Sequence, residues 1–226
     1  AVCILAGIFF VGKGYFMYQT ALNECSLTDK VQSIRNRENF TKLEELPGMF
    51  INAVVAVEDH RYYDHGPIDI ISIGRAIWVD LSTFSLAEGG STITQQLAKN
   101  IYFTQEKKLE RKIAETFMAF ALEKRYGKDD ILELYVNTIY YGSGYYGVYD
   151  ASQGYFGKAP SEMTDYECTL LAGLPNAPSV YSPNVNPKLS EQRQQQVLGR
   201  MVDCGYITGE KARSIMANHN TSPFIP

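Results

Sequence analysis

Residues 89 to 100, Gly-Gly-Ser-Thr-Ile-Thr-Gln-Gln-Leu-Ala-Lys-Asn, constrain this chain more than any other segment. Two glycines precede Ser91, which we expect to be the N-cap of a helix. Six polar side chains fall on two adjacent stripes of that helix: Ser91, Gln95 and Lys99, beside Thr92, Gln96 and Asn100. Such a face suits a polar ligand, and the positive end of the helix dipole favours an anion. The alternative is a solvated helix face after a flexible loop.

A glutamate at the end of an apolar run is the second informative feature. Phe50, Val54 and Val57 are spaced like the buried face of a helix, and Glu58 follows them directly. A carboxylate beside apolar surface loses solvation, which raises its pKa and suits it to accept a proton near neutral pH. The alternative is an ordinary carboxylate at a helix end, paired with Arg61.

A third segment combines two cations with a carboxylate. The expected core stripe of its helix comprises Leu109, Ile113, Phe117 and Phe120. On another face, Arg111 and Glu115 lie four residues apart, where a surface ion pair contributes a few tenths of a kcal/mol. The adjacent cations Arg111 and Lys112 would suit a diphosphate equally well.

Together with two further segments, these features resemble the peptidoglycan glycosyltransferases, the lysozyme-like enzymes that polymerise lipid II. The five matching motifs are residues 58 to 65 completed by Asp69, residues 89 to 100, residues 111 to 115, residues 131 to 137 running on through Gly142 to Gly147, and residues 174 to 179. The resemblance covers residues 46 to about 215. Two positions depart from the family pattern: Tyr62 stands where Phe is usual, and Pro67 where Gly is usual.

The resemblance implies a mainly α fold, a lysozyme-like helical domain with a smaller membrane-proximal subdomain. It implies that Glu58 is a general base that deprotonates the 4-hydroxyl of the lipid II GlcNAc. This oxygen attacks the anomeric carbon of a lipid-linked MurNAc with inversion, and undecaprenyl pyrophosphate departs. Glu115 matches a second essential carboxylate, which orients cations or a divalent ion at the diphosphate.

The resemblance also implies substrate contacts. The expected substrate-binding residues are Asp59, Arg61, Ser91, Thr92, Gln95, Gln96, Lys99, Asn100, Lys107, Arg111, Lys112, Asn137 and Asn176. Among them, Lys99, Arg111 and Lys112, with Lys107 as a further candidate, are expected to stabilise the diphosphate. No cofactor is required; Mg²⁺ or Mn²⁺ assistance follows from the resemblance and from diphosphate chemistry. The spacing of the histidines and cysteines predicts no zinc site.

Composition and the N-terminus bear on location. The net charge of −4 favours neither a nucleic-acid binder nor a polybasic membrane anchor. Residues 1 to 22 carry only Lys13 as a charge and have about the length of a membrane-spanning helix. A signal sequence or a truncated anchor is the competing interpretation. We expect an anchor over 1–22, a linker over 23–45 and the catalytic domain over 46–226, held outside the cytoplasm by the implied single-pass topology.

Helices are expected over 48–61, 69–79, 91–101, 106–126, 129–139, 161–173, 190–204 and 208–217. The Ser-, Thr- and Gly-rich segment 80–90 predicts a lid over the donor groove. The run of tyrosines and glycines over 140–157 predicts a loop packed by its own aromatic rings, with direct stacking on a sugar as the alternative.

Other interpretations stay open on the sequence alone. A lysozyme-like hydrolase could use Glu58 as a general acid, although glycan cleavage has no diphosphate for the cations to neutralise. An inactive scaffold that recruits other cell-wall synthesis proteins is the other rival. No Ser-x-x-Lys occurs, so the chain is expected to be a monofunctional glycosyltransferase or the N-terminal module of a bifunctional one. The short tail after the last expected helix favours the first.

Overall fold

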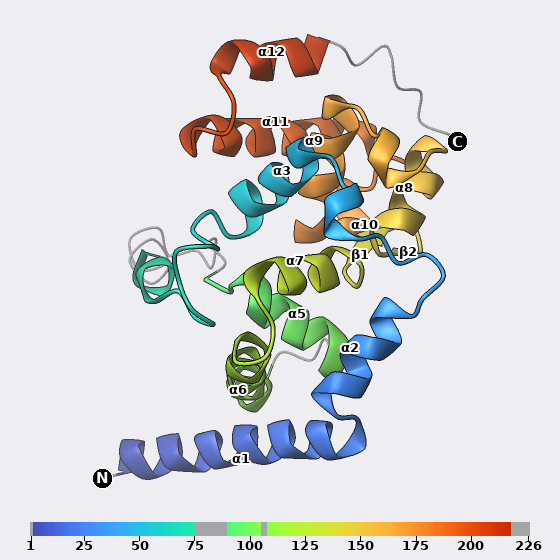
Figure 1. Cartoon of the computed structure of the whole chain (residues 1–226). Coiled ribbons are helices and arrows are strands. Elements are labelled where there is room, and N and C mark those ends of the chain that lie inside the picture. The colour runs from blue at the N-terminus through green and yellow to red at the C-terminus, as the bar shows by residue number, and fades with distance from the viewer. Residues whose placement is uncertain (1, 76–89, 105–107, 218–226) are drawn as a thin grey trace. The chain divides into compact units, whose positions relative to one another are not determined.

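The computed structural model describes residues 2–75, 90–104 and 108–217. The chain divides into two compact units (Figure 1). Unit 1 comprises Ala1–Arg35 with Tyr62–Tyr135, and unit 2 comprises Asn36–Arg61 with Val136–Pro226. Apart from one short hairpin, the regular elements of the described residues are helical, so the prediction of a mainly α fold is confirmed.

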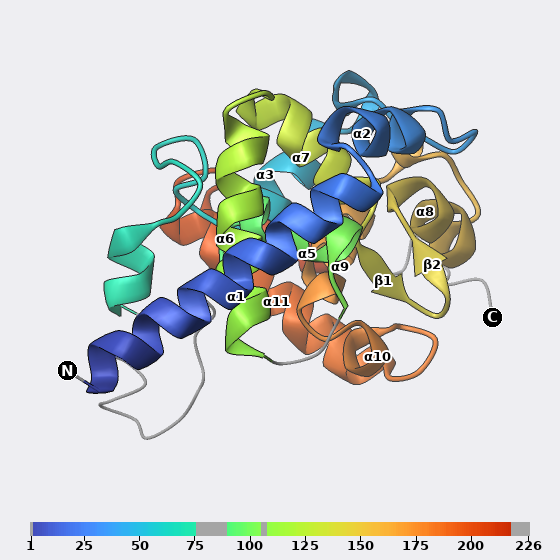
Figure 2. The ribbon, with the colours of Figure 1, turned by 90° about the horizontal axis from the view of Figure 1, so that it is seen from below.

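Unit 1 is a stack of helices. Its elements are α1 (Val2–Glu24), α2 (Leu27–Arg35), a helical segment over 70–75, α5 (Ile93–Tyr102), α6 (Leu109–Glu123) and α7 (Lys128–Val136, whose last residue falls in unit 2). Helix α6 packs against α1 on one side and α5 on the other, and Figure 2 shows α1 crossing α6. Leu97 of α5 and Met118 and Leu122 of α6 are fully buried, and Thr94 Oγ1 of α5 donates a hydrogen bond to Glu123 Oε1 of α6 at 2.6 Å.

The expected core stripe of α6 is only partly right. Leu109 and Phe120 are 56% and 49% exposed, whereas Ala114, Glu115, Met118, Ala119 and Leu122 are buried. Ile113 and Phe117 face α1: the ring of Phe117 packs against Tyr15 and Tyr18. The buried face of α6 is therefore a second stripe, which includes Ala114, Met118 and Leu122. Glu115 lies on this face and is buried with them.

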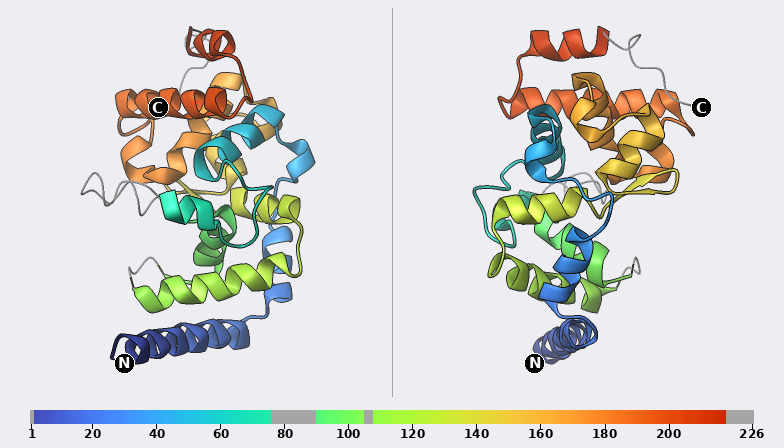
Figure 3. Two further views of the ribbon diagram at one scale, coloured as in Figure 1. Left: turned by 90° about the vertical axis from the view of Figure 1, so that its left-hand side faces the viewer. Right: turned by 45° about the vertical axis from the view of Figure 1, so that its right-hand side comes forward.

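Unit 2 is built around α9. Its helices are α3 (Gly48–Glu58), α8 (Val148–Phe156), α9 (Asp165–Gly173), α10 (Pro178–Tyr181), α11 (Pro187–Asp203) and α12 (Gly209–Ala217). Helix α9 contacts both α3 and α11, and almost all of its residues are buried. Figure 3 shows α11 and α12 as consecutive helices at one end of this unit. Three 3₁₀ turns, Leu43–Glu45, Pro160–Glu162 and Leu174–Asn176, complete it.

The segment expected to be an aromatic loop contains a hairpin and the helix α8. Strands β1 (Tyr140–Gly142) and β2 (Tyr145–Tyr146) are antiparallel, with Tyr140 opposite Tyr146. Gly142 has φ +94°, and a Cβ there would lie 2.6 Å from the carbonyl oxygen of Pro178. Glycine is therefore required at this position, because both the backbone conformation and the close contact exclude a side chain.

Other predictions from the sequence differ from the structure or concern residues that the structure does not describe. The expected linker 23–45 holds α2, whose Leu27, Val31 and Ile34 are buried, and a 3₁₀ turn. The helix expected over 129–139 ends at Val136. The lid over 80–90 and the end of the helix over 69–79 fall largely outside the described residues. Within the described part of the chain, no helix combines the length and apolar character needed to cross a membrane, so the span over 1–22 is not confirmed.

Two glycines of α1 give a matched test of its packing. A Cβ on Gly14 would lie 2.5 Å from Ile113 Cγ2 and 2.9 Å from the carbonyl oxygen of Glu110, whereas one on Gly12 meets nothing within 4 Å. Gly14→Ala should therefore weaken the docking of α1 by about 1–3 kcal/mol. Gly12→Ala should be neutral, or stabilising by up to about 1 kcal/mol, because alanine favours helix. Hydrogen exchange of the α1 amides measures both; equal protection in the two variants would contradict the packing.

Candidate functional site

Thr92, rather than the expected Ser91, is the N-cap of α5. The Thr92 hydroxyl accepts a hydrogen bond from the Gln95 N–H at 3.1 Å, and the Gln95 side-chain oxygen accepts one from the Thr92 N–H at 3.1 Å. This reciprocal pair is a capping box. Both side chains are buried, and Thr92 Oγ1 also donates to the carbonyl oxygen of Pro67. These contacts position the start of α5, and substrate contact by Thr92 and Gln95 stays a prediction.

Ser91 instead meets a charged cluster on α6. Lys112 Nζ donates to Ser91 Oγ at 2.6 Å and lies 3.3 Å from Glu115 Oε2. Arg111 pairs with the other oxygen, Oε1, of Glu115. The Glu115 side chain is 2% exposed and that of Arg111 is 13% exposed, whereas that of Lys112 is 41% exposed. One buried carboxylate thus fixes two cations, and one of them reaches solvent.

The electrostatics of this cluster favour an added anion. Burial, followed by repulsion from Arg111 and Lys99, lowers the pKa of Lys112 to about 8. Three cations therefore lie around a single carboxylate, and the excess positive charge is partly withdrawn from water. An anion that contacts Lys112 would offset this repulsion and favour the protonated form of the lysine. The chemistry suits a phosphate or a diphosphate.

The other predicted residues of unit 1 are placed as follows. Gln96 is half-buried, and its side-chain oxygen accepts a hydrogen bond from the Tyr135 hydroxyl at 3.2 Å. Asn100 and Lys99 are half-buried near the end of α5. Lys107 lies outside the described residues. The structure therefore brings together five of the predicted site residues, namely Ser91, Lys99, Arg111, Lys112 and Glu115.

Glu58 is the last residue of α3, in unit 2. It is half-buried, and its Oε1 is shielded from solvent. The neighbouring Asp59 is buried, and Arg61 is half-buried. Of the expected buried face of α3, Phe50 and Val54 are buried and Val57 is half-buried, so α3 presents Glu58 at the edge of a packed core.

Tyr141, which sequence reasoning did not single out, lies near Glu58. It is fully buried in unit 2, and burial, followed by the negative charge of Glu58, raises the pKa of its phenol well above the usual value. Its hydroxyl donates to the carbonyl oxygen of Val136. The phenol therefore stays neutral near physiological pH. The only indication in the sequence was that Tyr141 precedes Gly142 in a run rich in tyrosine.

Two asparagines expected to bind substrate differ in their surroundings. Asn137 is buried, and its amide clamps the backbone of Thr41, accepting from its N–H at 2.9 Å and donating to its carbonyl oxygen at 2.8 Å. Asn137 is therefore a structural link within unit 2. Asn176 is exposed at the end of a 3₁₀ turn, where it remains available to a ligand.

Comparison with known proteins decides the family. Residues 26–202 match the family model described as transglycosylase. The chain belongs to the transglycosylase family. It is 45% identical to penicillin-binding protein 1F of Bacillus subtilis over 186 residues, which cover 81% of this chain and 26% of that protein. A Cupriavidus necator protein with the provisional name transglycosylase is 43% identical over 180 residues, covering 80% and 78% of the two chains.

Among solved structures, the crystal structure of penicillin-binding protein 1A from Haemophilus influenzae is similar. It is 26% identical, and the match covers 81% of this chain and 18% of that one, with a TM-score of 0.47. The transglycosylase chain thus spans about a quarter of the length of penicillin-binding protein 1F.

The low pKa of Lys112 predicts a pH dependence of anion binding. As the pH rises through about 8, the ammonium loses its proton, so the affinity for inorganic diphosphate should fall by about tenfold between pH 7 and pH 9. Lys112→Arg keeps its charge over this range and should lack that decrease. Isothermal titration calorimetry of both proteins at each pH measures the effect. Because diphosphate titrates equally in both experiments, the difference between wild type and Lys112→Arg isolates the titration of Lys112. Parallel pH profiles of the two proteins would contradict the assignment of Lys112 to anion binding.

Proposed function

We propose that this chain is a peptidoglycan glycosyltransferase module that polymerises lipid II into glycan strands. In this reaction a β-1,4 bond forms with inversion at the anomeric carbon, and undecaprenyl pyrophosphate leaves. The observation that carries the proposal is the cation cluster on α5 and α6, in which the buried Glu115 holds Arg111 and a partly exposed Lys112. Membership of the transglycosylase family supports the same reaction.

The cluster suits the leaving group. Negative charge develops on the diphosphate as the bond to the anomeric carbon breaks, and fixed cations stabilise such charge without reorganising. Glu115 restrains Arg111 and Lys112 before substrate arrives, and Ser91 restrains Lys112 from the side of α5. Lys99 adds a third positive charge, and the amide groups of Gln96 and Asn100 are proposed to bind the donor sugar or phosphates.

Glu58 is proposed as the general base for the acceptor. Its carboxylate would take the proton of the 4-hydroxyl while that oxygen forms a bond to the anomeric carbon. Its position at the end of α3, with one oxygen shielded from solvent, fits a base that must keep bulk water from competing. The neutral Tyr141 phenol nearby cannot accept the proton.

Mg²⁺ or Mn²⁺ fits the residues of this cluster poorly. Both oxygens of Glu115 are already engaged, one by Arg111 and the other by Lys112, and the neighbouring charged groups are cations. A divalent ion needs oxygen ligands, so it would have to displace these contacts. We therefore propose that side-chain cations neutralise the diphosphate.

The N-terminal helix is proposed to face the membrane that holds the lipid substrate. Large apolar side chains are exposed along the first two thirds of α1: Leu5, Ile8, Phe9, Val11, Tyr15 and Phe16. Their burial in a lipid surface would be favourable. Attachment to the cell membrane with the catalytic residues on the extracytoplasmic side, and contacts with other cell-wall synthesis proteins, are part of this proposal.

The base assignment predicts a specific loss in Glu58→Gln. Glutamine keeps the size of the side chain but cannot accept the proton, so polymerisation of labelled lipid II should fall by about two to four orders of magnitude. Lipid II binding should change little, because the base acts mainly in the transition state. Glu44→Gln, an exposed site in the same unit, is the control. A folded Glu58→Gln protein with near wild-type turnover would remove Glu58 as the base.

A further inference from the structure

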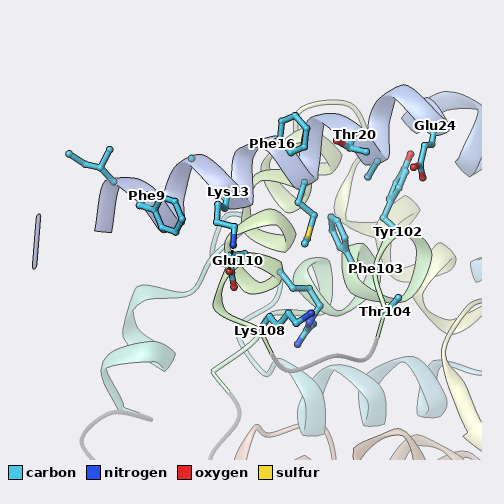
Figure 4. Close-up of a pocket in the computed structure, with 15 residues that line it drawn as sticks. Phe9, Lys13, Phe16, Thr20, Glu24, Tyr102, Phe103, Thr104, Lys108 and Glu110 are labelled. Atoms are coloured by element: carbon cyan, nitrogen blue, oxygen red, sulfur yellow. Dashed lines mark hydrogen bonds and ion pairs between the residues drawn. The ribbon is translucent and has the colours of Figure 1, made fainter. Parts of the chain in front are cut away.

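A large groove in unit 1 runs along α1. Its cavity volume is about 900 Å³, within the range of ligand-binding pockets. One wall is α1, and the other is the end of α5 and the start of α6, both of which belong to the same unit. Figure 4 shows Phe9, Lys13 and Thr20 on α1, with Tyr102, Phe103 and Lys108 across the groove.

The lining of the groove is amphiphilic. Apolar groups supply most of it, including Ile8, Phe9, Met17 and Phe103. Three cations also line it, Lys13, Lys108 and Arg111, and Lys13 pairs with Glu110 at 3.1 Å. A ligand with a long apolar part and an anionic end would match this distribution.

Arg111 connects the groove with the cation cluster. The same side chain lines the groove and pairs with Glu115, which in turn holds Lys112. An anionic group bound by the cluster would therefore lie beside the groove, so that an attached hydrocarbon chain could enter it directly. On α1, Phe16 both lines the groove and is 73% exposed, which gives the groove an apolar outer edge.

We propose that this groove binds the hydrocarbon tail of a lipid diphosphate whose head group is held by Arg111 and Lys112. The inference rests on the proposed function and adds a tail-binding subsite to it. Phospholipid has apolar chains too, but it carries a single phosphate, whereas the adjoining cluster offers three cations to the head group. Tail length thus becomes a determinant of donor affinity.

The test measures separately how the diphosphate head group and the hydrocarbon tail contribute to binding affinity. Farnesyl diphosphate, with its fifteen-carbon tail, should bind the protein at least tenfold more tightly than inorganic diphosphate, because burial of each methylene is favourable. Dihexanoyl phosphatidylglycerol, kept below its micelle concentration, should compete poorly. Equal affinity of the two diphosphates, or equal competition by the phospholipid, would overturn the proposal.

Two glycines on α1 provide the matched variants. Gly12 lines the groove and Gly7 does not, and a Cβ at either position meets nothing within 4 Å. Gly12→Phe should fill the groove and remove the advantage of farnesyl over inorganic diphosphate, while the affinity for inorganic diphosphate stays unchanged. Gly7→Phe should retain that advantage. A Gly12→Phe protein that keeps the full advantage would place the tail elsewhere.

Failure of this proposal is distinguishable from failure of the proposed function. If only the groove assignment is wrong, the protein polymerises lipid II, and Gly12→Phe has no effect on the tail preference. If only the glycosyltransferase assignment is wrong, lipid II is not extended, but the tail preference and its loss in Gly12→Phe persist.

Discussion

The buried carboxylate of Glu115 is the interaction on which the chemistry of unit 1 depends. A charge with 2% side-chain exposure is costly unless it is paired, and Arg111 and Lys112 provide that pairing. The pairing fixes both cations on α6, and the bond from Lys112 to Ser91 ties them to the start of α5. The packing of α5 on α6 and the geometry of the proposed anion site are therefore set by the same contacts. The proposed site would therefore be assembled before any ligand arrives.

Much of this site could be predicted from sequence, because helical spacing is reliable over short distances. The four-residue interval between Arg111 and Glu115 correctly placed the two side chains together. It could not show that the pair is buried. Helix α6 has two apolar stripes, and periodicity alone does not tell which one packs on α5 and which one on α1. The exposed Leu109 and Phe120 are the result of that ambiguity.

The role of a polar residue is harder to predict from sequence, since its side chain can bind either a ligand or the protein's own backbone. Thr92 and Gln95 satisfy the start of α5, and Asn137 clamps Thr41. The hairpin at residues 140–146 was missed because its tyrosines and glycines read as a loop. Its course depends on a contact with Pro178, distant in sequence, which only Gly142 permits. Long-range contacts of this kind leave no local pattern.

The most direct test of the central claim is the thermal shift that inorganic diphosphate produces in Glu115→Gln. Loss of the carboxylate leaves Arg111 and Lys112 without their anion, so the free variant should be less stable and added diphosphate should raise its Tm more than that of the wild type. Glu123→Gln is the matched control, because Glu123 on the same helix pairs with Lys128 instead. It should lose stability without gaining an extra shift. Equal shifts in both variants would contradict the account.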